Sequence, residues 1–380
     1  MLEKARKIDV KRHYDVLHSI PEIGFELPRT IKYIRGVLEN LGYCITECGG
    51  GVVAEAGKGE KTILLRADMD ALLFDDGAFH ACGHDMHASM LLGAAELIKC
   101  YEDDLLCKVI LMFQPAEEIL QGASSMISAG ILDSGVDAAI MLHVLTAVPF
   151  KTGTLIIPPI GVSAPSADIF NISMVGKGCH GSTPWLGSDI TSAVNCTTML
   201  LGAIPCHVSP PSSATVLSIG SVKYGDVPNV IADNAIVCGS FRTFDYKVRD
   251  DIKSRIISIS DAIGNALKLK IEVDFKSGCP CFVNDKQLCE WAKKRVYEVV
   301  GNDRVAYASD LPVGGGSEDF AFISQKVPSI MLTLAAGSIS DGYREPLHSR
   351  KVKFDINALP YGTAILADFA FSYFKKNGPK

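Results

Sequence analysis

The sequence predicts an α/β protein in which a large domain with a mostly parallel sheet is interrupted by an inserted α+β domain. Three observations predict it. Short apolar runs alternate with segments of helical spacing before residue 164. Strands of alternating polarity dominate the middle of the chain, and the first pattern returns after residue 279. Strands separated by helices favour a parallel sheet that is covered on both faces.

The N-terminal part supplies both kinds of element. Apolar residues at helical spacing predict helices over 8–20, 29–41 and 87–100. The short apolar runs TILLRA, VILMFQ and DAAIMLHV predict buried strands over 62–67, 109–114 and 137–144.

The middle of the chain has a different pattern. Alternating residues predict strands over 168–175 and 235–241, with helices over 189–204 and 248–267. The Pro-rich stretch 209–213 predicts a loop. This combination is typical of a separate α+β domain.

The final part resembles the first. We expect a helix over 285–300, a strand over 329–335 and a helix over 358–374. The predicted division is therefore one discontinuous domain of 1–164 and 279–380, and an inserted domain of 165–278.

Composition narrows the classes of function. The net charge of −6 over 380 residues gives no basic surface for nucleic acid. The polar N-terminus lacks a secretory apolar region, and the apolar stretches are too short to span a membrane. The twelve cysteines are scattered without a CxxC pair, which favours buried thiols in a reducing compartment. We expect a cytoplasmic protein without a membrane partner.

The segment FHACGHDMH, residues 79–87, concentrates metal-binding side chains. It holds three of the nine histidines of the chain, and Cys82 lies among them. Thiolate and imidazole suit zinc and the neighbouring transition metals. Cys82 and His84 face one site if the backbone between them turns. The clustering argues against a loop that is His-rich by chance.

Carboxylates follow two of the predicted strands. Asp68 and Asp70 lie where one strand ends, which is where open α/β sheets place their sites, although a helix cap or turn explains Asp68 equally well. Glu117 and Glu118 follow another strand, and one of such a pair can bind a metal while the other acts as a general base. A charged helix N-terminus is the alternative for this pair.

Two further histidines carry no signal by themselves. His143 ends an apolar strand, where a histidine is usually a core residue, and His348 lies in the loop PLHS. Their assignment depends on a resemblance.

Taken in order, the motifs of the chain resemble the aminoacylase/carboxypeptidase-type metallopeptidase family. They are most similar to its amidohydrolase branch, which includes hippurate hydrolases, indole-acetyl-amino-acid hydrolases and N-acetyldiaminopimelate deacetylases. The resemblance extends from about His18 to His348. The motifs are RADMDAL, HACGHDMH, QPAEE, LHV, GKGCHGSTP, NVIAD, GSFRTF, GGSEDFAF and LHS.

The resemblance implies a catalytic α/β domain interrupted by a smaller α+β lid domain, and it implies roles for ten residues. Glu117 matches the general base, and Asp70 matches an aspartate that orients a metal ligand. In the lid, His180 matches a histidine that contacts the substrate carbonyl, and Asn229 and Arg242 match residues near the substrate carboxylate. The metal ligands match Cys82, His84, Glu118, His143 and His348.

The chain departs from the family pattern beside these motifs. The segment 73–79 is shorter than usual, Leu73 replaces a proline, and Ala232 replaces another in NVIAD. The ligands are intact, but the identity of the acyl group does not carry over.

The implied activity is metal-dependent hydrolysis of the amide bond of small N-acyl amino acids. Two divalent ions are expected, zinc or manganese first and cobalt or nickel next, with Cys82 bridging them. A dipeptidase or carboxypeptidase is the alternative, with Asp75 or Asp76 as the partner of a substrate amine. A catalytically inactive binding protein of this fold is a third reading. The expected partner is a small-molecule substrate. A homo-oligomer formed through the lid is a further possibility.

Overall fold

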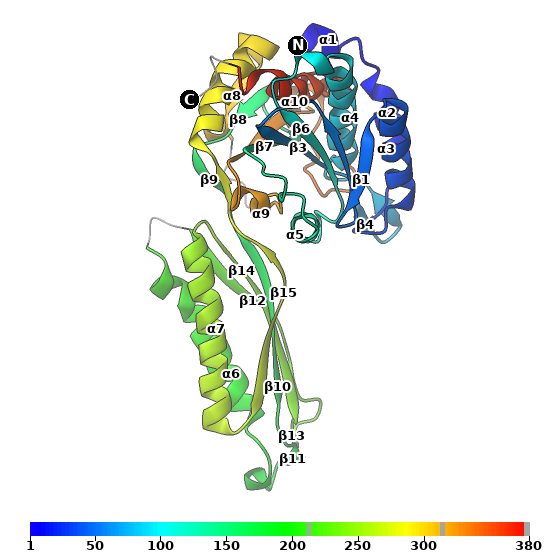
Figure 1. Cartoon of the computed structure of the whole chain (residues 1–380). Coiled ribbons are helices and arrows are strands. Elements are labelled where there is room, and N and C mark those ends of the chain that lie inside the picture. Colours follow the sequence, from blue (N-terminus) through cyan, green and yellow to red (C-terminus); the bar gives the residue numbers. More distant parts are fainter. Residues whose placement is uncertain (211–213, 312–315, 376–380) are drawn as a thin grey trace. The chain divides into compact units, whose positions relative to one another are not determined.

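The computed structural model describes residues 1–210, 214–311 and 316–375. The chain forms two compact units (Figure 1). Unit 1 comprises Met1–Ser163, Val283–Gly314 and Asp319–Lys380, and unit 2 comprises Ala164–Phe282 and Gly315–Glu318. We keep the division into a domain of 1–164 and 279–380 and a domain of 165–278 as a proposal. None of the described helices is both long and apolar enough to cross a membrane.

Unit 1 is built on a mixed sheet of eight strands among the described residues. Its centre is parallel, since β3 pairs in parallel with β6 and β7, and β18 pairs in parallel with β7. β1 and β2 extend one side in antiparallel fashion. On the other side, β8 is antiparallel to β18 and parallel to β17. In spatial order the strands are β1 (Cys44–Cys48), β2 (Gly51–Ala56), β6 (Lys108–Gln114), β3 (Thr62–Asp68), β7 (Ala138–Leu145), β18 (Ser329–Ala335), β8 (Leu155–Ile157) and β17 (Val305–Tyr307).

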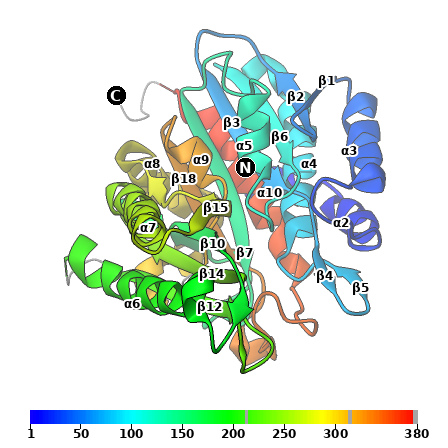
Figure 2. The same cartoon turned by 90° about the horizontal axis from the view of Figure 1, so that it is seen from below.

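Helices cover both faces of this sheet (Figure 2). One face carries α3 (Pro28–Asn40), α4 (His84–Cys100), α8 (Lys286–Val300) and α10 (Leu359–Ser372), with α1 (Leu2–Ala5) and α2 (Val10–His18) packed against them. The other face carries the short helices α5 (Gly122–Ser128) and α9 (Ala321–Ser324), which contact β6 and β18. The 3-10 helices of unit 1 are η1 (Glu102–Asp104), η3 (Asn302–Arg304), η4 (Ala308–Asp310), η5 (Ile339–Asp341) and η6 (Ile356–Ala358).

Two pairs of short strands accompany the main sheet of unit 1. β4 (Leu72–Phe74) and β5 (Gly77–Phe79) form a hairpin after β3. β9 (Gly161–Ala164) and β16 (Phe282–Asn284), which contain the points where the chain passes between the units, pair with each other.

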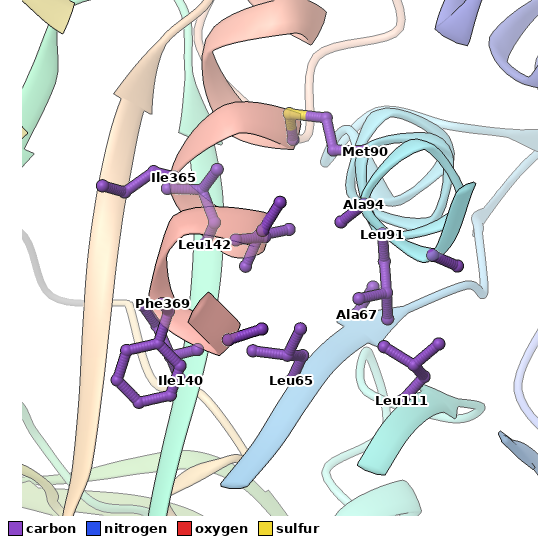
Figure 3. Packing of buried hydrophobic residues seen from close by; sticks show 14 of the residues in the cluster. Leu65, Ala67, Met90, Leu91, Ala94, Leu111, Ile140, Leu142, Ile365 and Phe369 are labelled. Carbon is purple, nitrogen blue, oxygen red and sulfur yellow. The ribbon is translucent and has the colours of Figure 1, made fainter. Parts of the chain in front are cut away.

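The main core lies between the sheet and the pair α4 and α10. Figure 3 shows apolar side chains of the central strands pointing toward Met90, Leu91 and Ala94 of α4 and toward Ile365 and Phe369 of α10. The two helices approach closely at Gly362, where an added Cβ would lie 2.0 Å from Sδ of Met90. A larger residue at this position would therefore force the Met90 side chain to move.

The alternation of side chains along the strands separates this core from the polar residues. Leu65 and Ala67 of β3 face the core, so Arg66 and Asp68 face the opposite side of the sheet. By the same alternation, His143 of β7 lies on that opposite face. Parallel strands thus bring polar residues together at their carboxyl ends.

Unit 2 is a four-stranded antiparallel sheet covered on one face by two helices. The buried face is apolar, and the other exposes Ile169, Val175 and Ile236. The sheet order is β12 (Thr215–Lys223), β14 (Asn234–Thr243), β10 (Ala167–Val175) and β15 (Lys270–Cys279), and the helices are α6 (Ile190–Val208) and α7 (Tyr246–Leu267). A small ribbon pairs β11 (Cys179–His180) with β13 (Val230–Ile231), and η2 spans Pro184–Leu186.

The structure confirms the predicted α/β class and each predicted helix and strand, with local differences. α6 ends at Val208 rather than at 204. α4 begins at His84 rather than at 87. β7 continues to Leu145, so His143 lies inside the strand and does not end it. Glu117 and Glu118 lie in a turn and α5 begins only at Gly122, so the interpretation as a helix N-terminus is wrong. Of the predicted loop 209–213, residues 211–213 lie outside the described residues.

Candidate metal centre

A turn at Gly83 places the first two candidate ligands. Gly83 has φ +85 and precedes the first residue of α4. An added Cβ there would lie 2.3 Å from Cγ2 of Val144, so both the backbone angle and the close packing require glycine. The turn directs Cys82 and His84 toward the same group of side chains.

Five side chains form two overlapping groups that share Cys82. Cys82, His84 and His143 make one group, and Cys82, Glu118 and His348 make the other, with the ligand atoms of each group within 4.8 Å of one another. Sγ of Cys82 lies 3.6 Å from Nε2 of His143 and 3.3 Å from Nε2 of His348. Because the sulfur belongs to both groups, a thiolate there lies between two positions for an ion.

Two buried atoms of this cluster fit a cation. Among the described residues, Nε2 of His84 and Oε1 of Glu118 have no hydrogen-bond partner, and they lie 3.7 Å apart. Burial of an unpaired polar atom is costly, and such atoms are rare in folded proteins. An ion held at about 2.0–2.2 Å from a nitrogen and a carboxylate oxygen would satisfy both. The donor set of thiolate, imidazole and carboxylate suits a transition metal.

Asp70 forms hydrogen bonds with three residues of the cluster. Its carboxylate accepts the backbone N–H of Glu117 at 3.1 Å and that of Glu118 at 3.2 Å. Its backbone carbonyl lies 2.9 Å from Nδ1 of His84. Nδ1 must carry the proton in this hydrogen bond, which leaves the lone pair of Nε2 for a metal. The buried Asp70 therefore fixes the backbone positions of Glu117 and Glu118 and the orientation of the His84 ring.

His87 also lies near the cluster, but its two nitrogens are used elsewhere. Nδ1 lies 2.6 Å from Oδ1 of Asp68, and Nε2 accepts the backbone N–H of Val144 at 2.8 Å. His87 therefore braces Asp68 and the end of β7 rather than binding an ion. The sequence allowed Asp68 to be either a cap or a functional residue. In the structure it is buried and holds His87 and Arg66 in place.

A buried polar network continues from Asp68 to the glutamates. The Arg66 guanidinium is fully buried and donates to Asp68 at 2.7 Å, to Gln114 at 2.9 Å and to Asp319 at 3.0 Å. The backbone N–H of Asp319 lies 3.4 Å from Oε1 of Glu117. The sequence predicts no role for Arg66, Gln114 and Asp319, because their pairing across the chain leaves no local pattern.

Burial and neighbouring charges set the protonation of the cluster. Burial lowers the pKa of His143 to about 3, so its ring is neutral and able to bind a metal. Burial raises the pKa of the Glu118 carboxyl and of the Cys82 thiol, which disfavours their negative charges. Burial also lowers the pKa of His84, but the nearby Asp68 and Cys82 outweigh it and raise the pKa well above its ordinary value. A metal ion would replace these protons with its own charge.

The three remaining predicted residues belong to unit 2. His180 and Asn229 are neighbours, since the N–H of Gly181 donates to the backbone carbonyl of Asn229 at 2.8 Å. The ring of His180 contacts Ser182 at 2.8 Å. Arg242 is exposed on β14 and donates to Ser317 at 2.8 Å. The proposed metal ligands lie in unit 1, so the roles of these residues toward a substrate remain proposals.

Comparisons with known proteins show the family of the chain. Residues 64–372 match the model of peptidase family M20/M25/M40. The N-acetyl-L-cysteine deacetylase of Bacillus subtilis is 35% identical over 348 residues, which cover 86% of this chain and 79% of that protein. The IAA-amino acid hydrolase ILR1-like 2 of Arabidopsis thaliana is 31% identical over 380 residues, which cover 96% and 85%.

A solved structure extends the likeness to the fold. The crystal structure of the Bacillus subtilis YXEP protein, described as a dinuclear metal binding peptidase from the M20 family, superposes with a TM-score of 0.74 at 27% identity. The match covers 95% of this chain and 97% of that one.

Proposed function

The chain belongs to peptidase family M20/M25/M40, and we propose that it uses the cluster around Cys82 to hydrolyse the amide bond of small N-acyl amino acids. The protein is a metal-dependent amidohydrolase of the amidohydrolase branch, and its products are a free amino acid and a carboxylic acid. One observation carries the proposal. Cys82 is shared by two ligand groups, and the paired carboxylates of Glu117 and Glu118 lie beside it.

Two divalent ions are the proposed cofactor, with zinc or manganese first and cobalt or nickel next. Cys82, His84, Glu118, His143 and His348 would hold them. The chemistry that bound ions supply is a lower pKa for water, toward about 7, and polarisation of the amide carbonyl.

Glu117 is the proposed general base. Its Oε2 lies 3.9 Å from Nε2 of His84, whereas each oxygen of Glu118 lies 3.7 Å from a ligand histidine. Glu118 approaches two ligand histidines and Glu117 only one, which supports Glu118 as the proposed ligand and Glu117 as the proposed base. Glu117 would take a proton from the attacking water and deliver it to the departing amine nitrogen. Asp70 fixes its backbone, and the N–H of Asp319 approaches its carboxylate.

We propose roles toward the substrate for three residues of unit 2. His180 would donate to the carbonyl oxygen as negative charge develops on it. Arg242 would bind the carboxylate of the substrate, for which its planar guanidinium is suited, and Asn229 would lie near it. His180 and Arg242 are both exposed to solvent.

A dipeptidase or carboxypeptidase of the same family is the alternative activity. A substrate with a free amine needs an acidic partner, and one of the two candidates is already engaged, because Asp76 is paired with Arg350. Asp75 is exposed and is the remaining candidate. The catalytically inactive reading predicts the loss of a ligand or of the base. Every ligand position and Glu117 are filled, which argues against it.

A homo-oligomer through the lid is a further proposal. β12 is an edge strand of the sheet in unit 2 and exposes Val216 and Val222. An exposed apolar edge favours pairing with a second copy. The proposed location stays cytoplasmic, as the sequence predicts.

The test of function is a substrate panel after defined metal loading. N-acetyl and N-benzoyl amino acids would be compared with dipeptides on the chelated and the reloaded enzyme. We expect hydrolysis of the N-acyl amino acids only after reloading. Faster turnover of the dipeptides would favour the alternative, and equal activity with and without chelator would contradict the metal-dependent proposal.

A further inference from the structure

The proposed ligand His348 lies on a loop that is held by contacts with other segments of the chain. Its side chain is 56% exposed, and its backbone has φ +64, in the left-handed region that residues other than glycine rarely adopt. Its N–H donates to the backbone carbonyl of Ala81 at 2.9 Å, which ties the loop to the segment before Cys82. A strained residue persists only where its surroundings hold it in place.

Arg350, two residues further on, supplies a second tie. Its guanidinium binds the carboxylate of Asp76 through Nε and Nη2, each at 3.0 Å from the nearest oxygen. The guanidinium carbon of Arg350 lies 4.5 Å from the ring centroid of Phe79 and 5.8 Å from that of Phe74. Two hydrogen bonds and an aromatic contact fix the direction of the group more firmly than charge alone.

All three partners of Arg350 belong to the β4–β5 hairpin. Asp76 lies in its turn, and Phe74 and Phe79 pack edge to face across it with centroids 6.5 Å apart. Phe79 also contacts His18 of α2, whose ring lies 2.6 Å from the buried carboxylate of Asp85. The hairpin is therefore anchored at the start of α4, beside the proposed ligands Cys82 and His84. It is also the shortened segment in which the chain departs from the family pattern.

We propose that Arg350 is a positioning residue for the metal ligand His348, and that it acts by fastening the His348 loop to the short β4–β5 hairpin through Asp76 and Phe79. The inference rests on the proposed role of His348 as a ligand. Arg350 keeps the pKa of the Asp76 carboxyl below its ordinary value, as expected for a formed ion pair. An exposed ion pair adds little to the stability of a fold, so the consequence of this one is local to the loop it holds.

The test is metal retention by the full chain loaded with Zn²⁺, titrated with a competing chelator. Arg350→Ala and Asp76→Asn should each weaken the binding of one of the two ions by about tenfold, the lower end for a residue that orients a ligand. Arg350→Lys keeps the charge but loses the two-pronged hydrogen bond, so it should fall between wild type and Arg350→Ala. Arg255→Ala is the matched control, because Arg255 pairs with Asp251 at similar exposure in unit 2 and should retain both ions.

A double-mutant cycle separates positioning from a general structural effect. If Arg350 acts through His348, then Arg350→Ala should weaken binding no further in a His348→Ala background. Equal weakening in both backgrounds would overturn the inference, and so would retention by Arg350→Ala that matches Arg255→Ala while His348→Ala loses an ion. Retention of both ions by His348→Ala would instead remove His348 from the proposed ligands, and the inference would fall with that assignment.

Discussion

Sγ of Cys82 and Nε2 of His348 lie 3.3 Å apart although 266 residues separate them in the chain. Cys82 precedes α4, and His348 lies on a loop near the end of unit 1. The contact belongs to the group of Cys82, Glu118 and His348, which shares Cys82 with the group of His84 and His143.

Glu117→Gln should keep the metal content of the wild type and lose about 10²–10⁴-fold in turnover, the contribution of a general base. The amide keeps the shape of the side chain but cannot take a proton from water. Elemental analysis and steady-state kinetics on one preparation decide it. Turnover equal to wild type would remove Glu117 from the base role.

Cys82→Ser should weaken metal retention more than any other Cys→Ser substitution. A serine hydroxyl is rarely ionised and is a harder ligand than a thiolate. The measurement is metal stoichiometry after dialysis, with Cys238→Ser on β14 as the control. If the two variants hold metal equally well, Cys82 is not a ligand.

Asp70→Asn should weaken metal binding by about 10–100-fold, as expected for a residue that orients ligands. The new NH₂ group would face one of the two backbone N–H groups that Asp70 now accepts, which would displace Glu117 or Glu118. Chelator competition measures the loss, and Asp75→Asn in the exposed hairpin turn is the control. Unchanged affinity in Asp70→Asn would show that the carboxylate does not position the cluster.

The Glu22 carboxylate accepts hydrogen bonds from the first turn of α3 and so caps this helix. Glu22→Gln tests whether this cap depends on pH. Burial raises the pKa of the Glu22 carboxyl, but hydrogen bonds from the backbone N–H groups of Thr30 and Arg29 lower it more, to below its ordinary 4.5. The stabilisation is therefore present above about pH 4.5 and is lost as pH falls through the lower folded-state pKa. Near pH 7 the variant should be less stable by about 1 kcal/mol, the usual value of such a cap.

Thermal unfolding at several pH values measures this effect. The gap between wild type and Glu22→Gln should narrow as pH falls below about 4.5. Glu3→Gln, at a side chain that is 81% exposed, should melt like wild type throughout. A gap that stays constant down to pH 3 would contradict the role of the ionised carboxylate.

The residues of unit 2 make a paired prediction. His180→Ala should lower kcat by about 10²–10³-fold without loss of metal, because an oxyanion donor acts mainly in the transition state. Arg242→Ala should raise KM for an N-acyl amino acid and have little effect on the corresponding amide, which lacks the charge. Loss of metal in His180→Ala would make it a ligand, and an equal effect of Arg242→Ala on both substrates would exclude the carboxylate contact.

Much of the fold could be predicted because its signals are local. The apolar runs of β3, β6 and β7 and the helical spacing of α3 and α7 each lie within one segment. The candidate ligands were found through ordered motifs, and Cys82 and His84 also through their spacing. His143 and His348 have no such spacing, since only the folded chain brings them to the sulfur.

The rest depends on contacts between distant parts of the chain. Arg66 and Asp319 are 253 residues apart, and neither belongs to a pattern that predicts a buried pair. The bond from Arg350 to Asp76 spans 274 residues in the same way. Asp70 is similar, because its link to the two glutamates runs through their backbone N–H groups, which no side-chain pattern reveals.

Anomalous X-ray diffraction from crystals of the chain loaded with Zn²⁺ tests the shared thiolate most directly. We expect two metal peaks about 3.5–4 Å apart, the spacing of two-metal sites, both bound to Sγ of Cys82. One peak should be completed by His84 and His143 or by Glu118 and His348, and the other by the remaining ligands. A single peak, or peaks that do not contact Cys82, would contradict the shared thiolate on which the proposed function depends.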